Sequence, residues 1–164
     1  MVDKEARVVR VHEIYIKATP AAIWEAITSP EWNGRYGYRA AAYFDLQPGG
    51  KYVAKANEGM KKFGLPEVII DGEIIEAMPP SKLVQTWRWL FDEKQRKEGF
   101  SVLTYEIVDT GRGFCRLTVT HDQTDQPTMA AATISKFDVR NGGGGWNWIL
   151  SDLKSLLETG KTMS

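Results

Sequence analysis

The chain has 164 residues, of which 43% are hydrophobic and 26% are charged, a balance typical of one globular domain with its own core. Lysine and arginine together number 21, as do aspartate and glutamate, so the formal net charge is zero and the basic surface of a nucleic-acid-binding protein is missing. No apolar run approaches the roughly 18 residues of a membrane-spanning helix, and we therefore expect a single domain over residues 1–164 with neither nucleic acid nor a membrane as partner.

The cysteine and histidine content limits the chemistry available to the chain. Cys115 is the only cysteine, so no intramolecular disulfide can form, as is usual in a reducing cytoplasm. We expect it to be a small, buried, apolar side chain. One cysteine and two histidines far apart in the sequence form no recognisable zinc site. The polar N-terminus has no apolar signal-peptide core, and we expect a cytoplasmic protein without metal or cofactor.

The first predicted elements are a strand and two short helices. Residues 7–18 alternate as a strand does, and apolar side chains on both sides of it suggest that both faces are partly covered. Thr19 and Pro20 then supply a helix cap and a proline at the first helical position, which predicts a helix beginning there. Ser29 and Pro30 repeat this signal, so a second short helix should follow at once.

Strands dominate the middle of the chain. The last two show the clearest alternation of apolar and polar side chains, the period-two pattern of strands with one buried face. The turns and loops between strands are rich in glycine and proline. Because the strands follow one another as hairpins, we expect an antiparallel sheet. The predicted strands cover residues 39–45, 51–56, 67–78, 82–91, 99–109 and 114–123.

Residues 124–141 are long for a connection without structure of its own. Ala130, Ile134 and Phe137 have helical spacing, so we expect a turn or two of helix here. We also expect this segment to be more mobile than the sheet and to border a cavity mouth as a lid. The four glycines at 142–145 are interpreted as a flexible hinge, with anion binding by the following helix as the alternative.

The final predicted element is a long helix that ends near Gly160. Its polar face is expected to include Asp152 and Lys154. A broad apolar stripe recurs at spacings of three and four along its other face. The stripe consists of Trp146, Ile149, Leu150, Leu153, Leu156 and Leu157. So wide a stripe must be covered, and the rest of the chain is mostly strand. We therefore expect the helix to lie in the concave face of one curved sheet.

A helix laid across a curved sheet leaves a wedge-shaped space, which is either filled by side chains or open to a ligand. The alternative to ligand binding is that aromatic side chains here simply fill the core. Trp32 and Tyr36 are placed at the rim, and Trp87, Trp89 and Trp146 are expected near one another. No catalytic residue is assigned. The candidate ligand-binding residues are Trp32, Tyr36, Tyr52, Gln85, Trp87, Trp89, Tyr105, His121, Trp146 and Leu150.

His121 is the most informative titratable side chain. It shares the strand parity of Leu117 and Val119, so it should point inward. It could bind a ligand carbonyl or act as an acid or base. The alternatives are a neutral histidine satisfied by a neighbouring hydroxyl group, or a residue at a strand end in water.

The order of these elements, a strand, two helices, six strands and a long helix, resembles the helix-grip fold of the START or birch-pollen-allergen-like superfamily, also called SRPBCC. Several short segments are similar to its branch named for the activator of the heat-shock-protein-ninety ATPase. They read ATPAAIW at residues 18–24, DLQPGG at 45–50, PPSKLVQTW at 79–87, LTVTH at 117–121 and GW at 145–146. The resemblance implies an α+β helix-grip fold, with a curved antiparallel sheet of six to seven strands around the C-terminal helix and a cavity between them.

Three functions remain open at this point. The preferred one is a protein that binds a small apolar, aromatic or lipid-like molecule between the sheet and the long helix. The second is a cyclase or hydrolase that uses His121 or a carboxylate as base, which needs a convergent polar pair that the sequence does not reveal. The third is a protein-interaction module, such as a chaperone cofactor. A homodimer and a chaperone contact are candidate partners, the latter on the resemblance alone.

Overall fold

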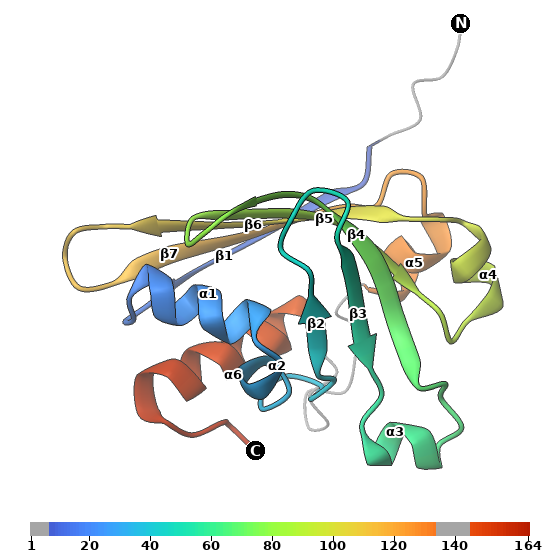
Figure 1. Cartoon of the computed structure of the whole chain (residues 1–164), viewed down its shortest axis with the longest axis horizontal. Helices are drawn as coiled ribbons and strands as arrows, with labels where there is room; N and C mark the ends of the chain where they lie inside the picture. Colours follow the sequence, from blue (N-terminus) through green and yellow to red (C-terminus); the bar gives the residue numbers. More distant parts are fainter. Residues whose placement is uncertain (1–6, 134–144) are drawn as a thin grey trace, which may run out of the picture.

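A curved antiparallel sheet and a long helix across its inner face form the core of this computed structural model, which describes residues 7–133 and 145–164 (Figure 1). The strand order is β1-β7-β6-β5-β4-β3-β2, so the first strand joins the last and β1 and β2 form the two edges. The strands are β1 (Val9–Ile16), β2 (Ala42–Phe44), β3 (Lys51–Lys55), β4 (Val68–Met78), β5 (Lys82–Trp89), β6 (Ser101–Asp109) and β7 (Cys115–Asp122).

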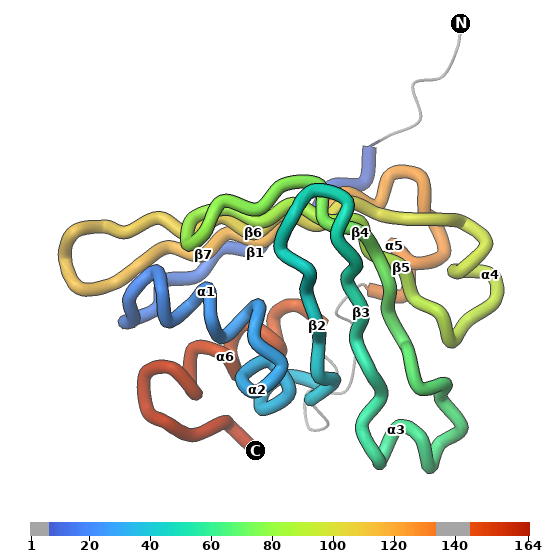
Figure 2. The backbone as a smooth tube through the Cα atoms, viewed as in Figure 1, coloured from blue at the N-terminus to red at the C-terminus, as the bar shows by residue number. Residues whose placement is uncertain are grey.

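The helices divide into those that cover the sheet and those that lie at its end. Figure 2 shows α1, α2 and α6 on one side of the sheet, with β2 and β3 bending down beside them. Figure 1 places α3 and α4 at the opposite end of the molecule from α1. No helix of the described part of the chain is long and apolar enough to cross a membrane. The helices are α1 (Pro20–Thr28), α2 (Pro30–Asn33), α3 (Glu58–Lys62), α4 (Glu93–Lys97), α5 (Pro127–Ala132) and α6 (Trp146–Thr159).

The first strand differs from its prediction on its outer face. Ile16 is fully buried under the helices, whereas Val11 and Tyr15 on the other face are 60% and 51% exposed. The expectation that both faces are partly covered is wrong for this outer face, because α1, α2 and α6 all lie on the inner side (Figure 1). The helix after this strand begins as predicted: the Ala22 N–H donates to the Thr19 hydroxyl at 3.2 Å, and Pro20 occupies the first turn.

Helix α6 buries the apolar stripe that the sequence predicts, with Leu150, Leu153 and Leu156 in the core. Gly160, at φ 78°, ends the helix in the left-handed conformation that glycine adopts most readily. Asp152 is the exception. The sequence places it on the exposed face, but it is 0% exposed. Two backbone N–H groups replace the water it would lose on burial, as the next subsection describes.

Two short helices lie where the sequence predicts only loops. Asn57 caps α3 by accepting a hydrogen bond from the Met60 N–H at 2.9 Å, and Asp92 caps α4 by accepting one from the Gln95 N–H at 2.9 Å. Helix α5 falls within the segment 124–141, where a turn or two of helix is expected. The remainder of that segment and the glycines at 142–144 lie outside the described residues, so the lid and hinge stay predictions.

Candidate ligand-binding pocket

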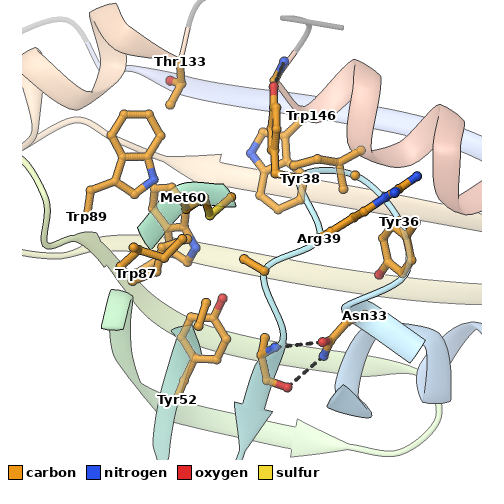
Figure 3. Close-up of a pocket in the computed structure, with 18 of the residues that line it drawn as sticks. Asn33, Tyr36, Tyr38, Arg39, Tyr52, Met60, Trp87, Trp89, Thr133 and Trp146 are labelled. Carbon is orange, nitrogen blue, oxygen red and sulfur yellow. Dashed lines mark hydrogen bonds between the residues drawn. The ribbon is translucent and has the colours of Figure 1, made fainter. Parts of the chain in front are cut away.

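An apolar pocket of about 360 Å³ lies between the inner face of the sheet, the loop after α2 and the start of α6 (Figure 3). Its volume falls within the roughly 300–1,000 Å³ of small-molecule sites. Strands β2 to β6 supply one wall, the exposed residues Tyr38 and Arg39 lie at the mouth, and Gly145, Trp146 and Ile149 close it from the helix side. Most of the lining side chains are aliphatic or aromatic.

The structure brings together six of the ten side chains proposed from the sequence. These six line the pocket: Tyr36, Tyr52, Trp87, Trp89, Tyr105 and Trp146. Strand parity places four of them on β3, β5 and β6. Tyr36 is buried within the site instead of standing at its rim, because its hydroxyl donates to the Ala26 carbonyl of α1 at 3.0 Å. Whether these side chains bind a ligand stays a prediction.

The other four proposed residues do not line the pocket. Trp32 packs on the core, with the Arg35 guanidinium 4.6 Å from its ring centre. Leu150 points into the core and is only 2% exposed. Gln85 is buried on β5, with its amide nitrogen 3.5 Å from the Thr86 carbonyl. The fourth is His121, whose contacts are described next.

His121 lies on β7, buried beside Trp146. The Trp146 indole N–H donates to His121 Nδ1 at 3.3 Å, so this nitrogen is the acceptor and Nε2 carries the ring proton. Nε2–H then donates to Ser101 Oγ at 2.7 Å, and the Ser101 hydroxyl donates to the Trp87 carbonyl at 2.8 Å. These three hydrogen bonds satisfy both ring nitrogens of His121 and orient the Trp146 indole.

Burial lowers the pKa of His121 from 6.5 to about 3, and the positive charges of Arg10 and His12 act in the same direction. Asp122 acts weakly against them. The prediction that His121 points inward is confirmed, and the residue is the neutral histidine satisfied by a hydroxyl group. Because both nitrogens are engaged and the ring does not line the pocket, the structure gives no support to His121 as a catalytic base.

Aromatic rings form a continuous wall on the sheet side of the site. Trp87 and Trp89 lie 5.6 Å apart between ring centres, and Phe91 continues the row 5.2 Å from Trp89. Tyr105 meets Trp146 edge-on at 6.1 Å. The predicted proximity of the three tryptophans is therefore confirmed, and all three line the same space (Figure 3).

The sequence predicts Trp32 and Tyr36 at the rim of the pocket, whereas the exposed residues of the lining in this region are Tyr38 and Arg39. Arg39 has a φ of 57°, a conformation uncommon for a residue with a side chain, and this shortens the predicted strand 39–45 to β2. Asp152 of α6 holds this loop by accepting hydrogen bonds from the Gly37 N–H at 2.8 Å and the Met163 N–H at 2.7 Å. The positive φ of Arg39 could not be predicted from the sequence, since arginine is not a typical residue in this conformation.

Asn33 fixes the floor of the mouth. Its side-chain amide donates to the carbonyls of Ile27 at 3.1 Å and Ala42 at 2.9 Å, and its oxygen accepts from the Ala42 N–H at 2.8 Å (Figure 3). All of its hydrogen-bonding capacity toward the pocket is thus used to join α2 to β2. Within the described residues, His, Cys, Asp and Glu side chains nowhere gather in threes that could hold a metal ion.

Several solved structures have the same fold. The chain resembles a protein from Mesorhizobium loti with a TM-score of 0.67 and 21% identity, over 92% of this chain and 97% of that one. It resembles an HSP90 activator from Plasmodium falciparum with a TM-score of 0.55 and 21% identity, over 94% and 90% of the two chains. It resembles the Aha1 dimer from Colwellia psychrerythraea with a TM-score of 0.59 and 18% identity, over 94% of this chain and 98% of that one. At these identities the likeness shows the fold alone, and the predicted α+β helix-grip fold is confirmed.

No curated protein matches the chain closely enough to count as a relative. The model of the family described as Activator of Hsp90 ATPase homolog 1-like protein matches residues 17–158, from the end of β1 almost to the end of α6. This match covers far more than half of the chain and agrees with the branch that the sequence segments resemble. The chain belongs to the family of Activator of Hsp90 ATPase homolog 1-like proteins.

Proposed function

We propose that this protein binds a small apolar or aromatic molecule in the pocket between the sheet and α6. The observation that carries the proposal is the lining itself: rings from β3, β5, β6 and α6 face one space of about 360 Å³. An apolar cavity of about 150 Å³ holds one benzene molecule, so a ligand of two fused rings is a reasonable fit. Transfer of such a ligand from water to these walls is favourable in proportion to the apolar area buried.

Tryptophan emission offers a direct test, because three indoles line the site. Titration with naphthalene derivatives and fatty acids should change the emission if any of them binds. Ala54, buried on β3 in the pocket wall, can be replaced by Leu to occupy part of the space. We expect Ala54→Leu to weaken binding by at least about tenfold, on the order of 1.4 kcal/mol.

The matched control is Ala21→Leu, the same substitution at an exposed site on α1. It should leave the affinity unchanged. If no compound changes the emission at micromolar concentration, or if both variants bind as the unmodified chain does, the pocket is not the binding site and the proposal fails.

A protein-interaction role is the second candidate, and one exposed side chain favours it. Phe63, which follows α3, is 88% exposed and is preceded by Lys61 and Lys62. Phenylalanine is enriched in the cores of protein interfaces relative to the rest of the surface. Two structures with this fold are an HSP90 activator and an Aha1 dimer. Light scattering on the purified protein and on the Phe63→Ser variant tests for a homodimer. If both proteins have the mass of one copy at every concentration, the homodimer is excluded.

A further inference from the structure

We propose that the pocket selects an electrically neutral ligand with a carbonyl or hydroxyl oxygen, and that the hydroxyl groups of Tyr52 and Tyr105 donate hydrogen bonds to that oxygen. This inference rests on the proposed ligand-binding function and narrows it to one chemical class. Three features of the described lining carry it: the lack of any charged side chain except Arg39, the prior engagement of several of its polar groups, and two phenols on the sheet whose hydroxyl groups donate to no described residue.

The first feature concerns charge. Among the described lining residues, Arg39 is the only one with an ionised side chain. Its guanidinium donates to the Ser164 carbonyl oxygen at 2.7 Å and points away from Tyr52 and Trp87 (Figure 3). An ionised ligand seated beside Tyr52 and Trp87 would lose its hydration without a partner of opposite charge in that part of the space. Burial of an unpaired ion is strongly unfavourable, so anions and cations should be rejected.

The second feature is that most polar groups of the lining already have protein partners. Asn33 uses both amide hydrogens and its oxygen on α1 and β2. The Tyr36 hydroxyl donates to the Ala26 carbonyl. The Trp146 indole N–H donates to His121. None of these donors is free for a ligand.

The third feature is a pair of phenols on the sheet wall of the pocket. Tyr52 on β3 and Tyr105 on β6 both line the pocket, and neither hydroxyl donates to any atom of the described residues. Figure 3 shows the Tyr52 ring rising from β3 with its hydroxyl toward the middle of the site. A ligand oxygen placed between these groups could accept a hydrogen bond from either hydroxyl.

Electrostatics keep both phenols in the donor form. Burial raises the pKa of Tyr52 above its usual value, with the Trp87 indole acting in the opposite direction. Burial also raises the pKa of Tyr105 well above its usual value, and the neighbouring Tyr52 and Tyr36 add to this effect. The three phenols therefore lie within electrostatic reach of one another and all stay protonated at neutral pH. A cluster of neutral O–H groups suits an uncharged oxygen acceptor.

A series of naphthalenes of nearly equal shape tests the proposal by isothermal titration calorimetry at pH 7. The series contains 2-acetylnaphthalene, 2-ethylnaphthalene, 2-naphthoate and 2-naphthylmethylammonium. We expect the ketone to bind about five- to tenfold more tightly than the ethyl compound, as one net hydrogen bond predicts. Both ions should bind at least tenfold more weakly than the ethyl compound.

Variants locate the effect on named hydroxyl groups. Tyr52→Phe and Tyr105→Phe keep the ring and remove the oxygen, so each should reduce the advantage of the ketone while the ethyl compound binds as before. Tyr43→Phe, on the exposed side of β2, is the matched control and should change neither affinity. Thermal unfolding of each variant checks that the fold is retained.

The outcomes separate this inference from the proposed function. If the ketone and the ethyl compound bind equally, or if 2-naphthoate binds most tightly, the selection of a neutral oxygen is wrong while binding in the pocket stands. If the ketone retains its full advantage in both Phe variants, the assignment to Tyr52 and Tyr105 is wrong. If no compound binds, the proposed function fails and this inference fails with it.

Discussion

His121 shows at the scale of one residue how burial links the site to pH. The unfolded chain takes up a proton on this imidazole below about pH 6.5, whereas the folded protein resists protonation until the pH nears about 3. Between these values the unfolded state binds more protons, so stability is fully present above pH 6.5 and declines as the pH falls toward 3. Each pH unit of that interval lowers the free energy of unfolding by about 1.4 kcal/mol.

We therefore predict that the free energy of unfolding falls by about 2 kcal/mol between pH 6.5 and roughly pH 5, before most carboxylates titrate. Urea denaturation at a series of pH values measures it. His121→Gln can still donate to Ser101 and accept from Trp146 but cannot titrate, so its stability should vary less over the same interval. Parallel pH profiles for the two proteins would show that His121 is not the source.

Asp152 is the second residue whose role depends on its partners. Its carboxylate accepts hydrogen bonds from the backbone N–H groups of Gly37 and Met163. Replacement by Leu keeps a side chain of similar size but removes the acceptor of both partly buried hydrogen bonds, and a buried unpaired group costs about 1–3 kcal/mol. We predict that Asp152→Leu lowers the free energy of unfolding by at least about 2 kcal/mol and increases hydrogen exchange at Gly37. A stability equal to that of the unmodified chain would contradict the anchoring role.

At the scale of elements, α6 decides the fold because it supplies the central apolar layer. Leu153→Ala should lower the free energy of unfolding by about 2–5 kcal/mol, since the side chain is buried and a cavity would remain. Ser151→Ala on the exposed face is the matched control and should stay within about 0.5 kcal/mol of the unmodified chain. Denaturant midpoints measure both effects, and equal shifts would mean that the helix faces the sheet differently.

Lys154 also lies on the polar face of α6, but it would be a poor control because it is half-buried and makes hydrogen bonds. Its ammonium group donates to the Tyr15 carbonyl of β1 at 2.6 Å and to Glu158 at 2.7 Å. The sequence pattern places it on the polar face of the helix, which is right, but the pattern carries no information about the neighbouring strand. The same contact explains how the end of β1 stays joined to α6.

At the scale of the whole molecule, the space between sheet and helix should accept a larger side chain. Ala54→Leu tests this through its effect on stability. A larger side chain forced into a filled core costs about 1–3 kcal/mol, but one that enters a void should cost little or nothing. We predict that Ala54→Leu leaves the melting temperature unchanged or higher. Ala26→Leu, at a fully buried site outside the pocket lining, should lower it.

Local patterns in the sequence suffice for most of the architecture. Caps at Thr19 and Ser29 followed by proline position the first two helices, and period-two alternation positions the hairpin strands. The same parity brings Tyr52, Trp87 and Tyr105 to the pocket wall. These features depend on neighbours in the chain or on the simple requirement that apolar faces be covered, and both are visible without a structure.

The sequence by itself determined a long helix laid against a curved antiparallel sheet, the inward faces of β3, β5, β6 and β7 and most of the aromatic wall, because alternation and capping act over a few residues. The tertiary structure decided the rest. It placed Asp152 in the core by pairing it with Gly37, more than a hundred residues away, and gave His121 its partners from β6 and α6. It also left the outer face of β1 in water. Such outcomes depend on which groups meet across the fold. From the local sequence a polar side chain is expected to stay in water, but a hydrogen-bond partner from a distant part of the chain can offset the cost of burying it.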